Sequence, residues 1–450
     1  MRDNFKPAVL IAGGGPTGMT AALELRRFGI PVRIVDEMEG PASTSRAVGI
    51  QARTLEEMEL RGLAGEFVRL GHHATGGNIY GEGKLIFHVD FTRIASPYNF
   101  LLFLSQTETD RILRDALEAE GSAVEWGVKL AAFGQTPTGV NVTLEHTDGS
   151  IEELAVQYVI DAEGAHSTIR NTLGLQFKGK TLNETFVLGD VHVAGELSSS
   201  DFHIFSCEQG LLALFPMGGS HFRLVAGNPP SDPPPSETPT LEELQAIYDQ
   251  RSHIPVRLRQ LTWSSIFQIN SRMVDTLRSG RIFLAGDAAH IHSPAGGQGM
   301  NTGIQDAMNL CWKLAFVLQG HAPEALLDTY DQDRLTVMKS VLNGTEGLTD
   351  VIGGHSILRT FFLHMAPWIA HTDFAQDAAT SRISQIALNY RTSPLVGGSL
   401  WRRFARRGRS RSRCEHSHVC GLCGRNQVRN QTFVLAPQSV ALDPPARQFH

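Results

Sequence analysis

The stretch "AVLIAGGGPTGMTAALELRRFGIPVRIVDE", residues 8–37, decides the fold of the first half of the chain. It reads as a short apolar strand, a glycine turn, an apolar-periodic segment that ends at Phe28, and a second strand. The turn carries the pattern Gly13-x-Gly15-x-x-Gly18. Between a strand and a helix, this pattern predicts a Rossmann-like site for a dinucleotide on a doubly wound sheet.

Each glycine of this turn has a mechanical reason. Gly13 permits the turn, Gly15 lets the backbone approach a pyrophosphate, and Gly18 lets the helix and the strand pack closely. Pro16 and Thr17 complete the turn and open the helix, whose N-terminus faces the anionic phosphates. These residues are therefore candidate cofactor ligands.

The acidic end of the second strand completes the fingerprint. Asp36 lies 18 residues after Gly18 and is expected to accept hydrogen bonds from ribose hydroxyls, with Glu37 beside it as a further candidate. An anion at this position disfavours a 2′-phosphate because the two charges would repel. NAD and FAD both fit, so this motif alone leaves the nucleotide open.

A second motif lies far downstream, in "GRIFLAGDAAHIHSPAGGQGMNTGIQDAMNLCWKLA", residues 280–315. A strand ends in Gly286 and Asp287, Pro294 follows, and a glycine cluster leads into a helix expected from about Thr302 to Leu318. This segment resembles the GD motif of the class A flavoprotein monooxygenases. That aromatic-hydroxylase family is typified by p-hydroxybenzoate and phenol hydroxylases.

The resemblance implies that the nucleotide is FAD. In this family Asp287 would hold the ribityl chain, Pro294 would lie beside the isoalloxazine, and residues 296–301 would offer backbone N–H groups to the pyrimidine edge. The positive end of the following helix would stabilise the negative charge of reduced flavin. The candidates in and around this loop are Gly286, Asp287, Pro294, Gly297, Gly299, Met300 and Asn301.

A third motif, "YVIDAEGAHSTIR" at residues 158–170, is similar to the family's DG motif, which is associated with flavin and nicotinamide cofactors. Alignment on Gly164 and Arg170 places Glu163 where the family usually has aspartate, and Asp161 where a small residue is common. Glu163, Gly164 and Arg170 are therefore candidate cofactor contacts, with the docking of NAD(P)H most affected by the longer side chain. By residue type alone, the segment also fits a solvated acidic turn.

Two smaller matches support the same family. Arg46, in "STSRAVGIQARTLE", corresponds to an arginine that approaches the flavin, and Gln106 corresponds to a glutamine at a helix start that contacts the cofactor. By itself, each would pass as an ordinary surface residue. The resemblance covers roughly residues 8–395 and closes with "NYRTSPL" at 389–395.

The resemblance implies an FAD-dependent monooxygenase that hydroxylates a phenolic or polycyclic aromatic substrate. In the family, NAD(P)H reduces the flavin, O2 adds at C4a to give a hydroperoxide, and its distal oxygen passes to the electron-rich ring. The cavity must exclude water, so we expect the substrate between a β-rich lid and the "HSPAGGQG" loop. NAD(P)H would bind transiently, since no second G-x-G-x-x-G is present; NADPH and NADH both stay open.

Alternatives remain at this point. A related flavoprotein could carry out epoxidation or Baeyer–Villiger oxidation, and a flavin-binding protein could have lost oxygenase activity. His203, His221 and Tyr98 have side chains that could accept a phenolic proton, but nothing in their surroundings distinguishes one of them. We therefore assign no catalytic residue, and expect His290 and His292 to shape the flavin loop.

Composition points to a small-molecule partner. The 450 residues carry a formal net charge of −6, which gives no attraction to nucleic acid or anionic lipid. The N-terminus lacks the features of a signal peptide, and no window approaches the ~18 apolar residues of a membrane span, so we expect a cytoplasmic enzyme without membrane insertion. Five cysteines make no secreted disulfide framework. The assembly state stays open, a homodimer included.

The pattern of elements predicts an α/β fold. A helix is expected at 105–121, with Ser105 and Glu108 as a capping box, and strands at 139–146 and 154–162. From 181 to 270 short β-like runs dominate, with a helix that opens at Thr240. We predict a discontinuous Rossmann-like FAD-binding domain with a helical C-terminal part (1–80, 100–180 and 271–395) and an inserted β-rich substrate domain (81–99 and 181–270).

Residues 396–450 have a different composition. Seven arginines crowd "RRFARRGRSRSR", residues 402–413, and a Cys/His cluster follows. An arginine run could bind RNA or acidic lipid, and the cluster could hold zinc. There is one CxxC pair rather than two, and Phe404 is the only aromatic residue between the arginines, so we predict a disordered tail that binds neither metal nor nucleic acid.

Overall fold

The predicted strand–turn–helix–strand unit forms β1 (Val9–Ala12), α1 (Pro16–Arg27) and β2 (Val32–Asp36) in a computed structural model of the chain. The two strands lie in a six-stranded sheet. Its neighbours are parallel except for the outermost pair. The order is β18 (Arg278–Ser279), β19 (Ile282–Leu284), β12 (Tyr158–Asp161), β1, β2 and β8 (Val124–Trp126). β1 and β12 are buried throughout, as expected for a parallel sheet that is covered on both faces.

The structure describes residues 7–42, 47–207, 209–228, 236, 238–291, 297–353 and 372–396. Three residues named from the sequence, Arg46, His292 and Pro294, lie outside this set. The arginine-rich and cysteine-rich part of the predicted tail, beyond residue 396, also lies outside it.

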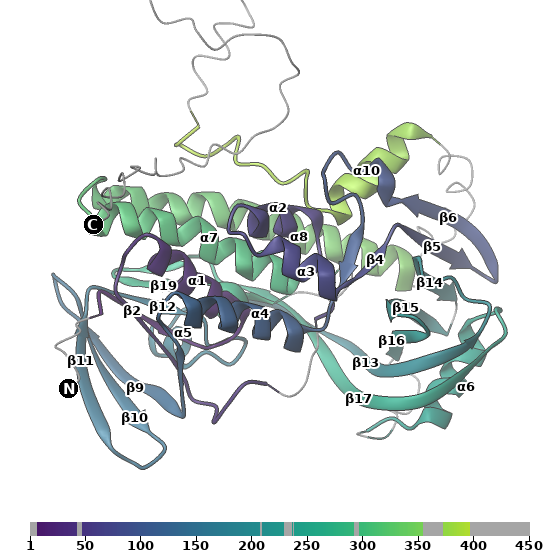
Figure 1. Cartoon of the computed structure of the whole chain (residues 1–450), viewed down its shortest axis with the longest axis horizontal. Coiled ribbons are helices and arrows are strands. Elements are labelled where there is room, and N and C mark those ends of the chain that lie inside the picture. Colours follow the sequence, from purple (N-terminus) through teal and green to yellow (C-terminus); the bar gives the residue numbers. More distant parts are fainter. Residues whose placement is uncertain are drawn as a thin grey trace, which may run out of the picture. The chain divides into compact units, whose positions relative to one another are not determined.

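One face of the parallel sheet is covered by helices. α1, α4 (Gln106–Ala119) and α7 (Gly299–Leu318) contribute Ala22, Leu113 and Leu310 to a single apolar core with the sheet. α7 and α1 lie side by side, as Figure 1 shows. The predicted start of α4 is confirmed, because the Ser105 side chain accepts a hydrogen bond from the Glu108 N–H at 3.3 Å.

The other face is covered by a small antiparallel sheet. It consists of β9 (Val128–Gln135), β10 (Val140–His146) and β11 (Ile151–Val156), in the order β11, β10, β9. Val142 of this sheet packs with Leu10 of β1 in a second apolar core. The short helix α5 (Thr168–Thr172) follows β12.

An eight-stranded sheet forms the second large layer. Its order is β20 (His290–Ile291), β17 (Val256–Met273), β13 (Lys178–Gly195), β16 (His221–Asn228), β15 (Gly210–Gly218), β14 (Asp201–Cys207), β5 (Gly76–Gly81) and β6 (Lys84–Asp90). Neighbours are antiparallel except for β14 and β5. β20 follows β19 of the parallel sheet along the chain and pairs with the end of β17, so residues 282–291 pass from one sheet to the other.

The two faces of the eight-stranded sheet differ in what covers them. Its outer face packs against α6 (Leu241–Arg251), which begins after Thr240, as predicted, with a capping box formed by Thr240 and Glu243 (Figure 1). Its inner face meets a three-stranded sheet in the order β3 (Gly49–Ile50), β7 (Leu101–Phe103), β4 (His72–Ala74). α2 (Ala52–Glu59), α3 (Ala64–Leu70) and the short η1 (Phe91–Arg93) lie near this small sheet.

The C-terminal part is helical, as predicted. η2 (Gly286–Ala288) precedes α7, and η3 (Glu324–Asp328), α8 (Thr329–Gly353) and α10 (Asp373–Ile383) follow it. Gln376 of α10 hydrogen-bonds the backbone of β6 twice, at Asp90 N–H and at the His88 carbonyl. α10 is thereby fastened to the edge of the eight-stranded sheet.

Two predicted elements have different bounds in the structure. Residues 154–162 form the end of β11 and all of β12, and these strands belong to different sheets with Gln157 between them. Alternation of apolar residues cannot reveal the point where a chain leaves one sheet for another. α7 begins at Gly299 rather than at Thr302, because glycines at a helix start can adopt the helical conformation.

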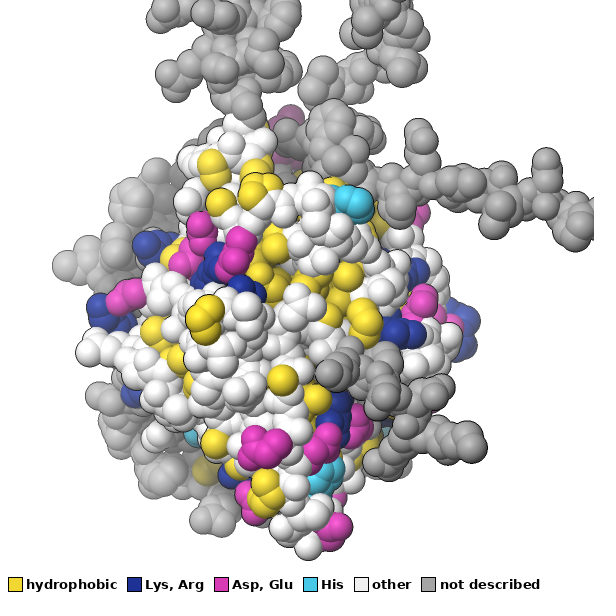
Figure 2. Space-filling model, turned by 90° about the vertical axis from the view of Figure 1, so that its left-hand side faces the viewer, with side chains coloured by type: hydrophobic (Ala, Val, Ile, Leu, Met, Phe, Trp, Pro, Cys, Tyr) yellow, Lys and Arg dark blue, Asp and Glu magenta, His cyan; other side chains and the backbone are white. Residues whose placement is uncertain are grey.

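The surface carries charges of both signs. On the face shown in Figure 2, acidic and basic side chains are interspersed around an apolar centre. Among the helices that the structure describes, none is both long enough and apolar enough to cross a membrane.

Candidate functional site

The glycine turn between β1 and α1 is closed tightly on itself. Gly13 has φ +110°, and a Cβ there would overlap the carbonyl of Ala162; a Cβ at Gly18 would overlap the carbonyl of Gly13. Gly15 is different, because nothing in the described chain lies within 4 Å of where its Cβ would be. α1 begins at Pro16 without a side-chain cap. An open, uncapped helix N-terminus suits a pyrophosphate.

Asp36 holds the glycine turn in place. Its two carboxylate oxygens accept hydrogen bonds from the N–H groups of Gly14, at 2.6 Å, and Met38, at 2.8 Å. Each oxygen keeps a lone pair for a ribose hydroxyl. Glu37 is exposed and lies 3.7 Å from Lys129.

The first and second cofactor motifs meet in space. Gly286 has φ +63°, and a Cβ there would lie 2.6 Å from the Thr17 hydroxyl oxygen. A Cβ at Gly303, on α7, would overlap the same hydroxyl and lie 3.1 Å from Gly286 Cα. The first turn of α1, the Gly286 turn and the second turn of α7 therefore touch, although Thr17 and Gly286 lie far apart in the sequence.

Asn301 fixes a neighbouring segment rather than offering its side chain to a ligand. Its side chain accepts from the Gln51 N–H at 3.0 Å and donates to the carbonyls of Gly49 and Gly297, both at 2.8 Å. The backbone N–H groups at the start of α7 have no side-chain cap within the described chain. With Gly299 and Met300 they form a second helix N-terminus, and exposed Asp287 precedes them.

Asp161 is buried at the end of β12. Its carboxylate accepts from the Ser167 hydroxyl at 2.7 Å and from the Glu163 N–H at 3.2 Å, and its carbonyl accepts from the Ala285 N–H at 2.9 Å. Burial, and secondarily the charge of Glu163, raise the pKa of Asp161 to about 7. This carboxyl group is therefore protonated in the native state below neutral pH.

Glu163 and Arg170 both form hydrogen bonds with the backbone of the protein. The Glu163 carboxylate caps α5, accepting from the N–H groups of Thr168 at 2.8 Å and Ile169 at 3.1 Å. Arg170 donates to the carbonyl of Ala288 at 3.0 Å. Since Ala288 lies in the second motif, Arg170 ties the third motif to it.

A buried charged network lies behind the Gly286 turn, and sequence reasoning missed it. Asp306 of α7 accepts from the Gly286 N–H at 3.1 Å, from His290 Nε2 at 2.7 Å and from Arg334 Nε at 2.6 Å. Arg334 also donates to the Tyr390 hydroxyl at 2.8 Å. Burial alone would raise the pKa of Asp306, but Arg334 and His290 outweigh it and lower that pKa.

Two signals could have indicated this network. Asp306 is a charged residue on the apolar face of a predicted helix, and such a residue is normally paired. Tyr390 lies in the "NYRTSPL" segment, with which the resemblance to the family ends. The expectation that His290 shapes the loop agrees with its contact to Asp306.

Two further candidates are Gln106 and Gly164. Gln106 lies at the start of α4, where its N–H donates to the Ala47 carbonyl and its side chain accepts from the Ala47 N–H. It therefore contacts the segment that follows Arg46. Gly164 adopts φ +84°, in the turn before α5.

The three candidate bases lie in different places. His203 is buried on the outer face of the eight-stranded sheet, where it contacts Tyr80 and the Ser198 carbonyl. Tyr98 is half-buried, and burial together with Glu59 raises its pKa. His221 lies on the inner face, next to His192.

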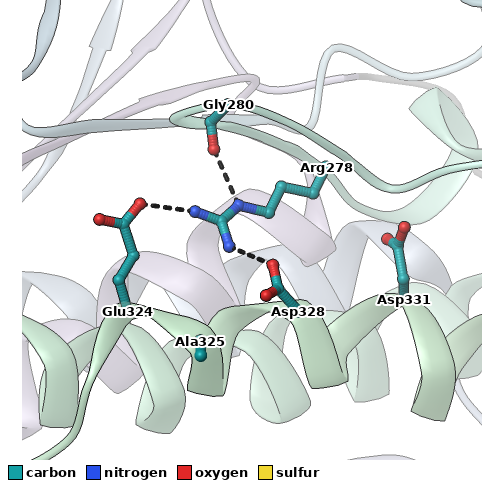
Figure 3. A pocket seen from close by; sticks show the side chains of 6 residues that line it. All are labelled: Arg278, Gly280, Glu324, Ala325, Asp328 and Asp331. Carbon is teal, nitrogen blue, oxygen red and sulfur yellow. Dashed lines mark hydrogen bonds and ion pairs between the residues drawn. The ribbon is translucent and has the colours of Figure 1, made fainter. Parts of the chain in front are cut away.

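A surface hollow of about 530 Å³ lies away from these motifs, between β18 and η3 (Figure 3). The Arg278 guanidinium in it pairs with Glu324 at 2.7 Å and with Asp328 at 2.6 Å. Asp331 accepts from the Thr276 hydroxyl at 2.6 Å. These contacts fasten β18 to the helices, and the hollow is no part of the candidate site.

The convergent motifs fit FAD on structural grounds. Within the described residues, α1 and α7 begin without side-chain caps or acidic first-turn residues, and the first turn of α1 lies against the Gly286 turn and the second turn of α7. Such ends bind phosphate and stabilise negative charge. Gly15 also leaves open space where a diphosphate would approach the backbone.

Comparison with known proteins agrees with this geometry. The chain matches the FAD binding domain family over residues 6–345. It is 37% identical to 6-methylpretetramide 4-monooxygenase of Streptomyces rimosus, covering 87% of this chain and 72% of that protein. It is 35% identical to pentachlorophenol 4-monooxygenase of Sphingobium chlorophenolicum, covering 85% and 71%. The chain is also similar to the solved structure of OxyS, the anhydrotetracycline hydroxylase from Streptomyces rimosus, with a TM-score of 0.72 and 30% identity. This similarity covers 86% of this chain and 77% of that one.

Replacing Gly286 by alanine should remove bound FAD. The new Cβ would push against Thr17 and separate the two motifs. Gly29→Ala is the matched control, because Gly29 has a similar φ of +73° but open space around it. Both variants share the backbone cost of about 1–2 kcal/mol. Flavin absorbance per protein should fall strongly only in Gly286→Ala, and equal flavin content in both would contradict the close approach.

Asp161→Asn should gain stability relative to the wild type as pH rises. The raised pKa means that the native state binds this proton more tightly than the unfolded chain does. The free energy of unfolding of the wild type therefore falls as the pH rises from the ordinary pKa of 3.8 to about 7. Asparagine carries no such penalty and can make both hydrogen bonds. Urea unfolding at about pH 5 and about pH 8 measures the difference.

The control for this pH effect is Asp148→Asn. Asp148 is exposed, and hydrogen bonds from Ser150 lower its pKa, so its contribution has the opposite sign. A stability difference between Asp161→Asn and the wild type that stayed constant with pH would contradict a protonated Asp161.

Asp306→Asn should destabilise the protein by about 3–5 kcal/mol, because it leaves Arg334 buried without a counter-charge. Asp377→Asn is the matched control: it breaks an exposed pair with Arg93, which solvent screens, so the loss of stability should be much smaller. Denaturant unfolding of both variants checks the prediction. Similar losses in the two would show that the buried network contributes no more than a surface pair.

Proposed function

Because the chain belongs to the family of FAD-dependent aromatic monooxygenases, we propose that it uses NAD(P)H and O2 to hydroxylate a phenolic or polycyclic aromatic substrate. The observation that carries this proposal is the contact between Thr17 and the Gly286 turn, which brings both halves of an FAD site together. The relatives act, by their names, on pentachlorophenol, 6-methylpretetramide and anhydrotetracycline.

The proposed FAD contacts are those expected from the sequence. FAD accepts a hydride and activates O2, chemistry that no amino-acid side chain supplies. The glycine turn and α1 would receive the diphosphate, Asp36 the ribose, and the start of α7 the flavin ring. The full set is Gly13, Gly15, Pro16, Thr17, Gly18, Asp36, Glu37, Arg46, Gln106, Glu163, Gly164, Arg170, Gly286, Asp287, Pro294, Gly297, Gly299, Met300 and Asn301.

Residues of this chain would supply the positioning. Arg170 and Asp306 hold the turn at Gly286–Ala288 from two sides, through the Ala288 carbonyl and the Gly286 N–H. Asn301 fastens Gly49 and Gln51 to the start of α7. We infer that this pre-formed frame keeps the flavin ring aligned with the substrate.

We place the substrate between the cofactor loop and the inner face of the eight-stranded sheet. Half-buried Phe215, Trp263 and Phe267 lie on that face, and ligand cavities are typically lined by such side chains. This layer would exclude water from the reacting centre. We propose a substrate domain of residues 81–99 and 181–270, inserted in an FAD domain of 1–80, 100–180 and 271–395.

The inner-face location favours His221 over His203 as a group near the substrate. Burial lowers the pKa of both histidines, so both are neutral at neutral pH. Of these two histidines, only His221 lies on the same face of the eight-stranded sheet as Trp263. NAD(P)H is proposed as a transient co-substrate without a binding domain of its own.

Purified protein should be yellow, and a phenol should accelerate its oxidation of NAD(P)H. We expect 2-naphthol to stimulate the rate about tenfold or more, since substrate-gated reduction protects the coenzyme from waste. The product should gain one oxygen atom from O2, as measured by mass spectrometry with ¹⁸O2.

Other outcomes separate the alternatives. An epoxide or a ring-expanded ester or lactone from an aromatic ketone would indicate a related oxygenase. A yellow protein whose NAD(P)H oxidation responds to no member of a phenol panel would indicate that oxygenase activity has been lost. Either result would contradict the hydroxylase proposal.

A further inference from the structure

Four side chains from adjacent strands form a row across the inner face of the eight-stranded sheet. They are Trp263 of β17, Asp190 of β13, Arg223 of β16 and Phe215 of β15, each opposite the next in register. Arg223 donates to both oxygens of Asp190, at 2.7 Å each. Its guanidinium carbon also lies 5.1 Å from the Trp263 ring centroid. The row is therefore a bidentate ion pair with an aromatic residue at each end.

The row faces away from α6. Gly189 and Val191, which flank Asp190, belong to the α6 side of the sheet. Phe222 and Leu224, which flank Arg223, also lie on that side. Because side chains alternate along a strand, Asp190 and Arg223 must lie on the inner face.

Neighbouring contacts connect this row of side chains to the start of α7. The ring centroids of Phe215 and Phe103 are 5.5 Å apart, and Phe103 pairs with Gly49. The Gly49 carbonyl accepts from the Asn301 side chain, at the start of α7. A ligand that lies against the inner face beside the start of α7 would therefore contact this row of side chains.

The row carries no net charge. The Arg223 side chain is 2% exposed and that of Asp190 13%, so the carboxylate is the more accessible partner. His221 is the next inner-face residue on β16, and burial lowers its pKa, so it adds no cation at neutral pH. Arg257 and Arg259 lie farther along β17 and are exposed, where solvent and salt screen their charges.

We propose that the cluster of Asp190, Arg223 and Trp263 is the polar part of the substrate cavity, and that Asp190, by neutralising Arg223, makes the cavity selective for aromatic substrates without a carboxylate. This inference rests on the proposed function and deepens it. Trp263 offers a face to an aromatic ring, and the ion pair offers polar groups to a phenolic or carbonyl oxygen. A carboxylate would be desolvated here without a free counter-charge and beside the Asp190 anion.

The test compares two probes that differ by one carboxylate, 2-naphthol and 6-hydroxy-2-naphthoic acid. Their dissociation constants for the FAD-loaded protein are measured from the quenching of Trp263 fluorescence, with Trp263→Phe identifying its share of the signal. The wild type should bind 2-naphthol about tenfold more tightly or better. Asp190→Asn removes the carboxylate that forms the bidentate ion pair with Arg223 and should shift the preference about tenfold toward the naphthoate.

Asp333→Asn is the matched control. It also removes the carboxylate from a buried ion pair, leaving Lys313 uncompensated, but between α7 and α8. A selectivity that shifts equally in both variants would indicate general loosening and overturn the proposal. An unchanged ratio in Asp190→Asn, or no binding of 2-naphthol by the wild type, would overturn it as well.

A second variant covers the case in which Asp190→Asn fails to fold. Trp263 is half-buried and its loss leaves no unpaired charge, so Trp263→Ala should fold and bind 2-naphthol about fivefold more weakly, measured by calorimetry. An unchanged dissociation constant would overturn the proposal. Binding that follows these expectations, with no phenol-stimulated oxidation of NAD(P)H, would contradict the proposed function and leave the cavity assignment standing.

Discussion

The close approach of three backbone segments at Thr17, Gly286 and Gly303 is the constraint on which the rest of the structure depends. The missing side chains of the two glycines let α1, the Gly286 turn and α7 touch. β1 and β19 are parallel and lie in one sheet, so the turns that follow them reach the same edge. Two helix N-termini therefore meet there, and their combined positive potential suits a dinucleotide that becomes more anionic on reduction.

The local parts of this site could be predicted from the sequence because their causes are local. Glycine spacing, a strand-end aspartate and the capping residues of α4 and α6 act within a few residues of the chain. The pairing of Asp306 with Arg334 could not be predicted, since it depends on how α7 and α8 pack. The side-chain role of Asn301 was likewise hidden, because its partner Gly49 lies some 250 residues earlier.

The eight-stranded sheet shows a second limit of sequence reasoning. Alternation establishes that neighbouring residues of a strand face opposite sides, but it does not say which side packs against a helix. The position of α6 decides this, and it separates His203 on the outer face from His221 on the inner one. Two histidines of equal standing in the sequence thus acquire different surroundings only through tertiary packing.

The third motif explains how a departure from the family pattern can be accommodated. Glu163 is one methylene longer than aspartate, and its carboxylate reaches the first N–H groups of α5, where the helix dipole favours an anion. Burial and, to a smaller extent, that charge raise the pKa of Asp161 to about 7, so below neutral pH Asp161 stays protonated and links β12 to the α5 turn without an uncompensated charge. Asp161 is therefore tolerated where a small residue is common because burial, with a smaller contribution from the charge of Glu163, keeps its proton in place.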